Sequence, residues 1–300
     1  MRVTQSMLSQ NMLRHLSDNY SNMGKYMDQL NTGKKVNLPS DDPVVAMKGI
    51  GYRSQVTRIE QYTRNTGEVR NWMDNSDAAL DKATKALQKL RELAVEASTD
   101  TLGEAERKNI KEEAEQLKEH LVDIANTNVN GKYIFNGTNI TEKPFSIDDG
   151  KVSATGLNTS GVEIEVAEGT KLQANVNPEA VFGKFEGDSA ENMFAKIDDF
   201  IHALDSNDAD LIDDSIGKLD EQIDNVINAR ADLGARSNRL DLIEDRLSEQ
   251  EIVATNMMSK NEDIDYEQVI TQLISQESIL RASLSAGSRI IQPTLLDFLR

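Results

Sequence analysis

The chain has 300 residues, no cysteine and a formal net charge of -18. The absence of cysteine excludes disulfides, thiol catalysis and a cysteine-ligated zinc site, and the acidic charge disfavours nucleic acid and anionic membranes as partners. Aromatic residues make up only 5% of the chain, so its apolar residues are mainly aliphatic, which favours helices that pack along their length.

The N-terminal region predicts one long helix with a coiled-coil seam. Residues 4–32 carry apolar side chains in alternating steps of three and four, the spacing that keeps one face of a helix against a partner. Asn, Thr, Gly and Pro residues between 31 and 40 then interrupt the pattern. The apolar residues of this face are Leu13, Leu16, Tyr20, Met23, Met27 and Leu30.

Two further helices are expected before the middle of the chain. Asp42 followed by Pro43 is typical of an N-cap and the first residue of a helix, and heptad steps then continue to Ala97. After a short interruption, a third apolar stripe runs from Ile110 to Ile124. We expect the third helix to return antiparallel to the second, because the turn between them is short.

Hairpin signals replace the helical periodicity near residue 130. Asn130-Gly131 and Asn136-Gly137 are hairpin-type turn dipeptides on either side of residues 132–135, where we expect the first strands. Between residues 144 and 187, glycines become frequent and β-branched residues alternate with polar ones. The sequence therefore predicts a small β-rich insert in an otherwise helical protein.

The C-terminal half carries the clearest heptad repeat. Apolar residues recur at every seventh position, which predicts one long helix whose partners are the helices of the N-terminal half. These residues are Leu219, Val226, Leu233, Leu240, Leu247 and Ala254. A final apolar segment, within residues 261–300, mirrors the N-terminal seam. Its members include Leu273, Leu280, Leu284, Ile291, Leu295, Leu296 and Phe298.

The predicted fold is mainly α, a long antiparallel coiled-coil rod formed by the two halves of the chain, with a small β-rich inserted domain. Residues 1–39 and 262–300 form a terminal coiled-coil domain. Residues 40–137 and 188–261 form the helical rod, and residues 138–187 form the surface insert.

We expect the terminal domain to be mobile in the lone chain. Ordering each residue costs about 1–2 kcal/mol of backbone entropy, whereas a fully buried apolar seam residue returns roughly 1.5–3 kcal/mol. Six seam residues cannot order a segment of that length, so neighbouring copies must supply the missing partner surface. The apolar residues named for the two terminal segments are therefore the predicted subunit-assembly residues.

Two motifs give the sequence a specific resemblance. Residues 33–37, followed by two aspartates, resemble the elbow of the flagellin superfamily, which is a family of bacterial flagellar proteins. Residues 228–240 are similar to the long C-terminal helix of the same family. The elbow residues are Gly33, Asn37, Asp41 and Asp42, and the helix residues are Arg230, Leu233, Gly234, Asn238 and Arg239.

The resemblance implies a structural subunit of the bacterial flagellum that is secreted without a cleavable signal peptide, has no cofactor and is not an enzyme. Residues 43–45, 131–138 and 169–172 resemble the members that lie at the hook–filament junction. Such members imply hook-associated protein 1 and flagellin as partners, self-association in a junction ring, and an export chaperone in the cytosol. The resemblance implies neither nucleic acid nor membrane as a partner.

Other functions remain as alternatives. The chain could be a minor flagellin that forms the filament itself, or an enzyme or generic coiled-coil adaptor. A metal site is disfavoured, because His15, His120 and His202 lack a second histidine at ligand spacing. Residues 205–210 invite a calcium-loop interpretation, but Asp210 stands where that loop requires glycine. Helix capping by Asn207 or Asp208 is the favoured interpretation.

Overall fold

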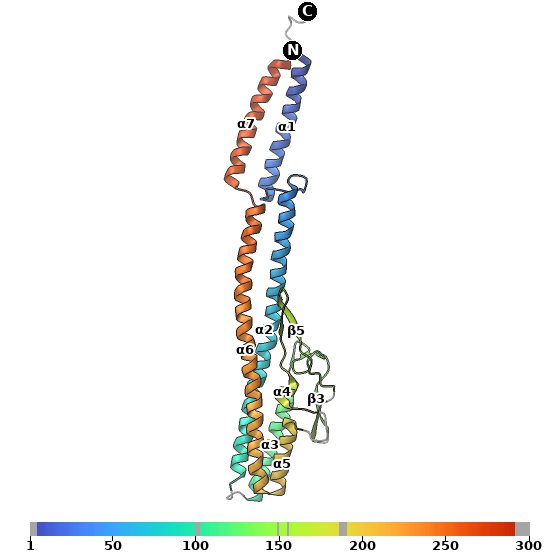
Figure 1. Ribbon diagram of the computed structural model, residues 1–300, viewed down its shortest axis with the longest axis vertical. Helices are drawn as coiled ribbons and strands as arrows, with labels where there is room; N and C mark the ends of the chain where they lie inside the picture. The colour runs from blue at the N-terminus through green and yellow to red at the C-terminus, as the bar shows by residue number, and fades with distance from the viewer. Residues whose placement is uncertain (1–4, 100–102, 149, 155, 186–190, 292–300) are drawn as a thin grey trace, which may run out of the picture. The chain divides into compact units, whose positions relative to one another are not determined.

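The computed structural model describes residues 5–99, 103–148, 150–154, 156–185 and 191–291 (Figure 1). Most of the described residues are helical. The helices are α1 (Gln5–Thr32), α2 (Pro43–Ala97), α3 (Glu104–Ala125), α4 (Pro178–Phe182), α5 (Met193–Ser206), α6 (Ala209–Glu262) and α7 (Tyr266–Ile291). The strands are β1 (Asn128–Val129), β2 (Lys132–Tyr133), β3 (Phe145–Asp148), β4 (Lys151–Ala154), β5 (Glu163–Ala167) and β6 (Thr170–Gln173). This confirms the predicted mainly-α fold with a small β-rich region.

The chain divides into two compact units. The smaller unit comprises Met1–Arg58 and Gln250–Arg300, and the larger unit comprises Ile59–Glu249. Helices α2 and α6 each contribute residues to both units. The three-domain division proposed from the sequence, with boundaries near residues 40, 137, 188 and 261, stays a prediction.

In the larger unit, α2 and α6 pack antiparallel along a heptad seam. The seam leucines of α6 are at most 2% exposed from residue 219 to residue 247, which confirms the predicted repeat. Ion pairs flank this seam. Arg70 of α2 pairs with Glu244 of α6 at 2.7 Å, and Arg91 pairs with Asp220 nearer the other end of the seam. The residue numbers of these pairs increase along α2 while they decrease along α6, as antiparallel helices require. The ion pairs therefore fix the register of the two helices.

Helices α3 and α5 add a second antiparallel pair to this unit. Lys111 and Lys118 of α3 pair with Asp205 and Asp198 of α5. Asn207 ends α5 in the left-handed conformation, with a φ of 56°.

The turn into α6 tests the two interpretations of residues 205–210. The Asp208 side chain accepts a hydrogen bond from the backbone N–H of Asp210 at 3.1 Å. The structure therefore confirms the capping interpretation of this acidic turn.

The strands form antiparallel pairs, β1 with β2, β3 with β4 and β5 with β6, within the described part of the chain. Asn130 and Gly131 both have positive φ, at 53° and 82°, as the predicted β1–β2 turn requires. The expected strand over residues 132–135 is shorter, because β2 ends at Tyr133. Ile134 and Phe135 instead turn into the core, where both are buried.

A cluster of phenylalanines joins the β-rich region to the helices. Phe145 of β3 lies 5.2 Å from Phe182 of α4 and 5.9 Å from Phe194 of α5, measured between ring centroids. Phe135 and Phe185 complete the cluster. Five of the seven phenylalanines in the sequence gather here. Edge-to-face and tilted ring pairs of this kind add to the stabilisation that comes from burying apolar surface.

The cluster predicts a large stability difference between two positions on one strand. Phe145→Ala leaves a cavity among buried rings and should lower the free energy of unfolding by about 3–5 kcal/mol. Ile147→Ala is the matched control, because Ile147 lies on the same strand and is exposed, so its cost should stay below about 1 kcal/mol. Urea unfolding followed by Trp72 fluorescence measures both values. Equal losses would contradict the role of the cluster.

Candidate assembly interface

Helices α1 and α7 of the smaller unit lie side by side and run antiparallel (Figure 1). The Gln276 side chain of α7 donates a hydrogen bond to the side-chain oxygen of Asn19 on α1 at 2.9 Å. Met12 lies so close to Gly287 that a Cβ added at Gly287 would stand 3.0 Å from the Met12 methyl carbon. These two contacts place residues 12 and 19 of α1 in the seam.

The seam buries one narrow stripe of each helix. On α1 the less exposed positions follow steps of three and four, as in a coiled coil. They include Ser9, Met12, Leu16, Asn19, Met23, Tyr26 and Leu30. The corresponding positions on α7 are Val269, Leu273, Gln276, Leu280, Ser283 and Gly287.

Only some of the predicted assembly residues lie in this seam. Leu16, Met23, Leu30 and Leu273 are half-buried in it, and Leu280 is buried. Leu284 is exposed. The side chain of Ile291 and residues 295, 296 and 298 lie outside the described part of the chain.

A second line of apolar residues on α1 lies beside the seam and is exposed. Leu13, Tyr20 and Met27 are 50–56% exposed, and we call these three residues the outer stripe. The sequence pattern places the outer stripe in the same seam as Leu16 and Met23. In the structure the seam instead uses positions 12, 19 and 26, one residue earlier on the helix. The role of both groups in subunit assembly stays a prediction.

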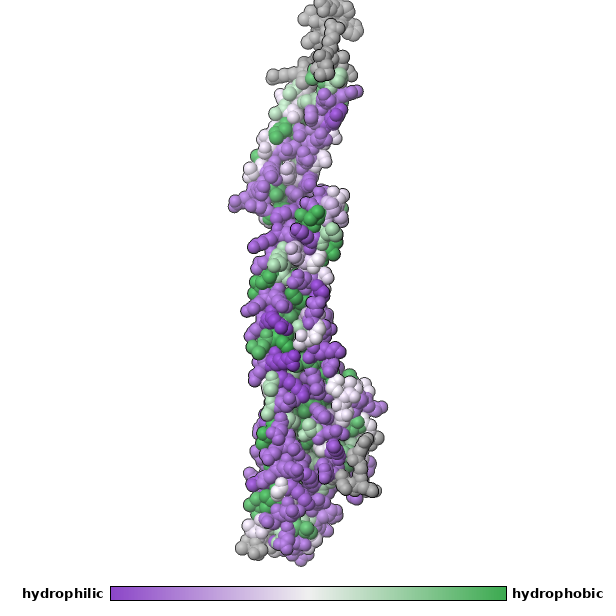
Figure 2. Space-filling view, viewed as in Figure 1, coloured by the Kyte–Doolittle hydropathy of each residue, from purple (hydrophilic) through white to green (hydrophobic). Residues whose placement is uncertain are grey.

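Exposed apolar side chains concentrate in the smaller unit. Among the side chains that the structure describes, 17 of the 22 large exposed hydrophobics belong to residues 5–58 and 250–291. They include Val44, Met47 and Ile50 on α2, and Ile252, Val253 and Met257 on α6. Figure 2 shows separate hydrophobic patches on this unit among hydrophilic side chains. Exposed apolar patches of this kind mark interaction surfaces.

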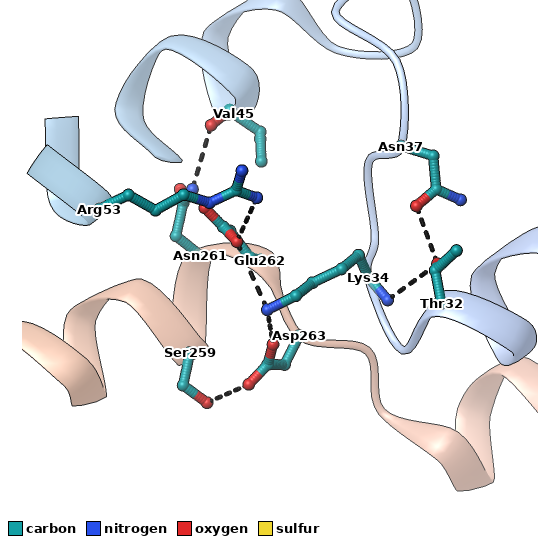
Figure 3. Close-up of polar contacts among 9 residues, drawn as sticks. All are labelled: Thr32, Lys34, Asn37, Val45, Arg53, Ser259, Asn261, Glu262 and Asp263. Carbon is teal, nitrogen blue, oxygen red and sulfur yellow. Dashed lines mark hydrogen bonds and ion pairs between the residues drawn. The ribbon is translucent and has the colours of Figure 1, made fainter. Parts of the chain in front are cut away.

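The connection between α1 and α2 (residues 33–42) is hydrogen-bonded to the connection between α6 and α7 (residues 263–265). We call these two connections together the elbow (Figure 3). The backbone N–H of Lys35 donates to the carbonyl oxygen of Glu262 at 2.6 Å, and the N–H of Ile264 donates to the carbonyl oxygen of Gly33 at 3.1 Å. Gly33 has a φ of +69°, and a Cβ there would lie 2.9 Å from the Tyr266 hydroxyl. Glycine is therefore required at this turn.

A buried carboxylate is central to the elbow (Figure 3). Glu262 is only 6% exposed, and one of its carboxylate oxygens lies 2.7 Å from the Arg53 guanidinium and 3.4 Å from the Lys34 ammonium. The other oxygen occupies the space that a side chain at residue 49 would fill, because a Cβ on Gly49 would stand 2.6 Å from it. Burial of an acidic residue is tolerated here because two cations face it.

Lys34 also pairs with Asp263 at 2.6 Å. The Asp263 hydrogen bond raises the pKa of Lys34 above its ordinary value of 10.5. The hydrogen bond from Lys34, and a second one from Ser259, hold the pKa of Asp263 below its ordinary value of 3.8. The pair therefore favours the charged form of both side chains.

The elbow residues identified from the sequence make local hydrogen bonds. The Thr32 hydroxyl donates to the side-chain oxygen of Asn37 at 2.8 Å. Asp41 accepts from the backbone N–H of Leu38 at 3.2 Å. The Asp42 carboxylate accepts from the N–H groups of residues 44 and 45, both at 3.0 Å. This geometry confirms Asp42 as the N-cap of α2.

The C-terminal helix motif, within residues 228–240, has some residues in the interior of the larger unit and others on its surface. Arg230 of α6 donates hydrogen bonds to Asp77 and Asp81 of α2, both at 3.0 Å, and Leu233 is buried in the helical seam. The other three motif residues are exposed on α6. They are Gly234, Asn238 and Arg239.

The three histidines of the sequence, His15, His120 and His202, are exposed and lie on three different helices. Within the described ranges, no group of three or more His, Cys, Asp or Glu side chains could hold a metal ion. No helix in that part of the chain is long and apolar enough to cross a membrane.

Comparison with protein families gives two matches at the two ends of the chain. Residues 3–140 match the bacterial flagellin N-terminal helical region. Residues 216–299 match the bacterial flagellin C-terminal helical region. Together the two matches cover about three quarters of the sequence, in the same order as in the family.

Individual relatives cover nearly the whole chain. Flagellar hook-associated protein 3 of Escherichia coli K12 is 28% identical over 304 residues, which cover 95% of this chain and 96% of that protein. The flagellin of Bacillus subtilis 168 is 26% identical over 295 residues, which cover 94% of each. A solved flagellar hook-associated protein-3 of Legionella pneumophila has a TM-score of 0.63 at 16% identity, covering 70% of this chain and 97% of that structure. This last likeness concerns the fold alone.

The positive φ of Gly33 predicts opposite effects of two glycine substitutions. Gly33→Ala forces an L side chain into the left-handed region, which costs about 1–2 kcal/mol, and crowds Tyr266 as well. Gly24→Ala should instead stabilise α1 by about 0.5–1 kcal/mol, because Gly24 is helical and its added Cβ meets no atom within 4 Å. Trypsin cleavage after Arg14 should become faster in the first variant and slower in the second. Equal cleavage rates would contradict this account of the elbow.

The Lys34–Asp263 pair predicts how one carboxyl group titrates. The folded-state pKa of Asp263 should lie below 3.8, so the pair contributes stability above that pH and loses it as the pH falls through the folded-state pKa. Both side chains are partly exposed, so the contribution should be below about 1 kcal/mol. An NMR titration of the Asp263 carboxyl carbon measures the pKa, and Lys34→Met should return it toward 3.8. An unchanged value in that variant would contradict the assignment to Lys34.

Proposed function

The chain belongs to the bacterial flagellin family, a family of structural flagellar proteins, and on this basis we propose that it is a hook-associated subunit of the hook–filament junction. Its proposed role is to adapt the hook side to flagellin, so that the filament can assemble. The Escherichia coli relative named flagellar hook-associated protein 3 supports this assignment, because it aligns along almost the entire chain.

The exposed apolar surface of the smaller unit is the observation that supports the proposal. Contiguous exposed apolar patches are uncommon on monomeric soluble proteins, and larger ones are typical of interaction sites. The large apolar side chains of this surface are 45–72% exposed, so each would gain about 1–2 kcal/mol if a neighbouring subunit buried the rest of it. The smaller unit is therefore suited to a position between other subunits, where the outer stripe and the patches on α2 and α6 are covered.

The partners follow from this position. We assign hook-associated protein 1 to the hook side and flagellin to the filament side, with copies of this chain beside one another in a junction ring. A cytosolic export chaperone would cover the C-terminal apolar residues before secretion. The proposed location is the extracellular part of the flagellum, reached without a cleavable signal peptide. A chain without cysteine suits unfolded export, because no disulfide has to be opened.

In this proposal, the terminal helices become ordered when the chain takes its place among neighbouring subunits. The seam between α1 and α7 includes polar residues such as Asn19 and Gln276, and several of its apolar residues are only half-buried. Such a pair gains little from its own packing, so we expect residues 1–39 and 262–300 to be mobile in the lone chain and ordered among neighbours. We assign the protein no catalytic activity and no cofactor.

A minor flagellin is the second candidate function, and the Bacillus subtilis flagellin relative favours it. The two candidates differ in self-assembly. A purified flagellin should polymerise alone into filaments, whereas a junction protein should not. Electron microscopy of the purified chain distinguishes them.

The outer stripe predicts which substitutions abolish assembly. In cells that lack this protein, hooks should form without filaments and flagellin should appear in the medium. The wild-type chain should restore filaments in such cells. A chain with Leu13→Ser, Tyr20→Ser and Met27→Ser should lower the number of filaments by more than about tenfold, because losing three apolar contacts removes several kcal/mol.

A matched variant on the same helix serves as the control. Arg14→Ser, Ser21→Ala and Asp28→Ser change three exposed positions with the same spacing, one residue after each member of the outer stripe. This variant should restore filaments as the wild type does. If the stripe variant also restores them while being exported at the wild-type level, the outer stripe is not an assembly surface.

A further inference from the structure

The methionines of this chain are distributed unevenly. Eight of the ten lie within residues 1–58 and 250–300. Four of these are exposed, Met7 by 53%, Met27 by 50%, Met47 by 72% and Met257 by 47%. We call these four residues the exposed methionine set.

The remaining described methionines are less accessible. In the larger unit, Met73 is 2% exposed and Met193 is fully buried. Met12, Met23 and Met258 of the smaller unit are half-buried. The thioethers that solvent reaches most easily therefore lie on the surface that we assign to subunit contacts.

Methionine has two properties that matter at such a surface. Its unbranched, polarisable side chain adapts to neighbours of different shape, so it suits a surface that meets more than one kind of subunit. Its sulfur is also oxidised readily, and the sulfoxide is a polar group that disrupts methionine-rich contacts. Leucine or isoleucine at the same positions would supply apolar area without this chemistry.

We propose that the exposed methionine set is a peroxide-sensitive modification site whose oxidation blocks the docking of this chain onto the flagellar hook and whose reduction restores it. This inference rests on the proposed function, because it takes the smaller unit as the docking surface. Hydrogen peroxide supplies the oxidant. The sulfur lone pair attacks one peroxide oxygen, the O–O bond breaks, and each thioether becomes a sulfoxide while one molecule of water leaves.

The free chain should tolerate this modification. The four side chains reach solvent, so a sulfoxide oxygen can be hydrated without displacing any core atom. In a covered interface the same oxygen would be buried without a hydrogen-bond partner, which disfavours docking. Oxidation should therefore separate folding from assembly, since it leaves the first intact and weakens the second.

The first part of the experiment maps oxidation in the purified full-length chain. Mild hydrogen peroxide should oxidise the exposed methionine set at least about tenfold faster than Met73 and Met193, as measured by mass spectrometry of peptides. Circular dichroism and Trp72 fluorescence should stay unchanged at the point where the four are oxidised. Equal oxidation of exposed and buried methionines, or loss of helix, would contradict a surface modification.

The second part measures docking on flagellar hooks isolated from cells that lack this chain. The oxidised wild type should bind at least about tenfold more weakly than untreated wild type, and treatment with methionine sulfoxide reductases should restore binding. A variant with Met7→Leu, Met27→Leu, Met47→Leu and Met257→Leu keeps apolar volume at these positions. Compared with its own untreated sample, the peroxide-treated variant should lose no binding.

The outcomes separate this inference from the proposed function. Undiminished binding of the wild type after all four residues are oxidised would overturn the inference and leave the proposed function intact. An equal loss in the leucine variant would also overturn it, because the half-buried methionines would then be responsible. Failure of the untreated wild type to bind hooks would contradict the proposed function, and this inference with it.

Discussion

The narrowness of a two-helix seam is the constraint on which the rest of this structure depends. A helix paired with one partner can bury only one stripe of its surface. In the larger unit, several helices and the phenylalanine cluster close the remaining faces, and the seam leucines of α6 are almost fully buried. In the smaller unit the outer stripe on α1, and the patches on α2 and α6, stay in water. In our proposal, other chains complete the burial of these apolar residues.

The sequence predicts much of the fold, because heptad spacing follows directly from helix geometry. The prediction is best for α6, where every seventh residue from 219 to 254 is buried as expected. It also succeeds for the Asp42 cap and the Asn130-Gly131 turn, because both depend on local chemistry alone. The sequence does not predict which flank of α1 faces α7. Positions 12, 19 and 26 are only one residue away from positions 13, 20 and 27. Contacts such as Asn19 with Gln276 and Met12 with Gly287 decide which of the two sets lies in the seam.

The elbow shows a second limit of sequence patterns. Its motif glycine and aspartates could be identified from the sequence, since they satisfy turn and capping requirements within a few residues. The ion pairs could not, because Lys34 and Arg53 meet Glu262 more than 200 residues away along the chain. Periodicity carries no information on such pairings. The small residue at position 49 is a signal only once the Glu262 carboxylate is seen against it.

The central claim is that α1 and α7 are held weakly in the lone chain and become firmly ordered between neighbouring subunits. Amide hydrogen exchange tests this claim most directly, measured on the free chain and on chain docked to isolated hooks. The account predicts that amides of residues 5–32 and 266–291 exchange much faster than those of residues 80–94 in the free chain, and become protected on docking. Protection of α1 and α7 in the free chain as strong as that of residues 80–94, unchanged on docking, would contradict it.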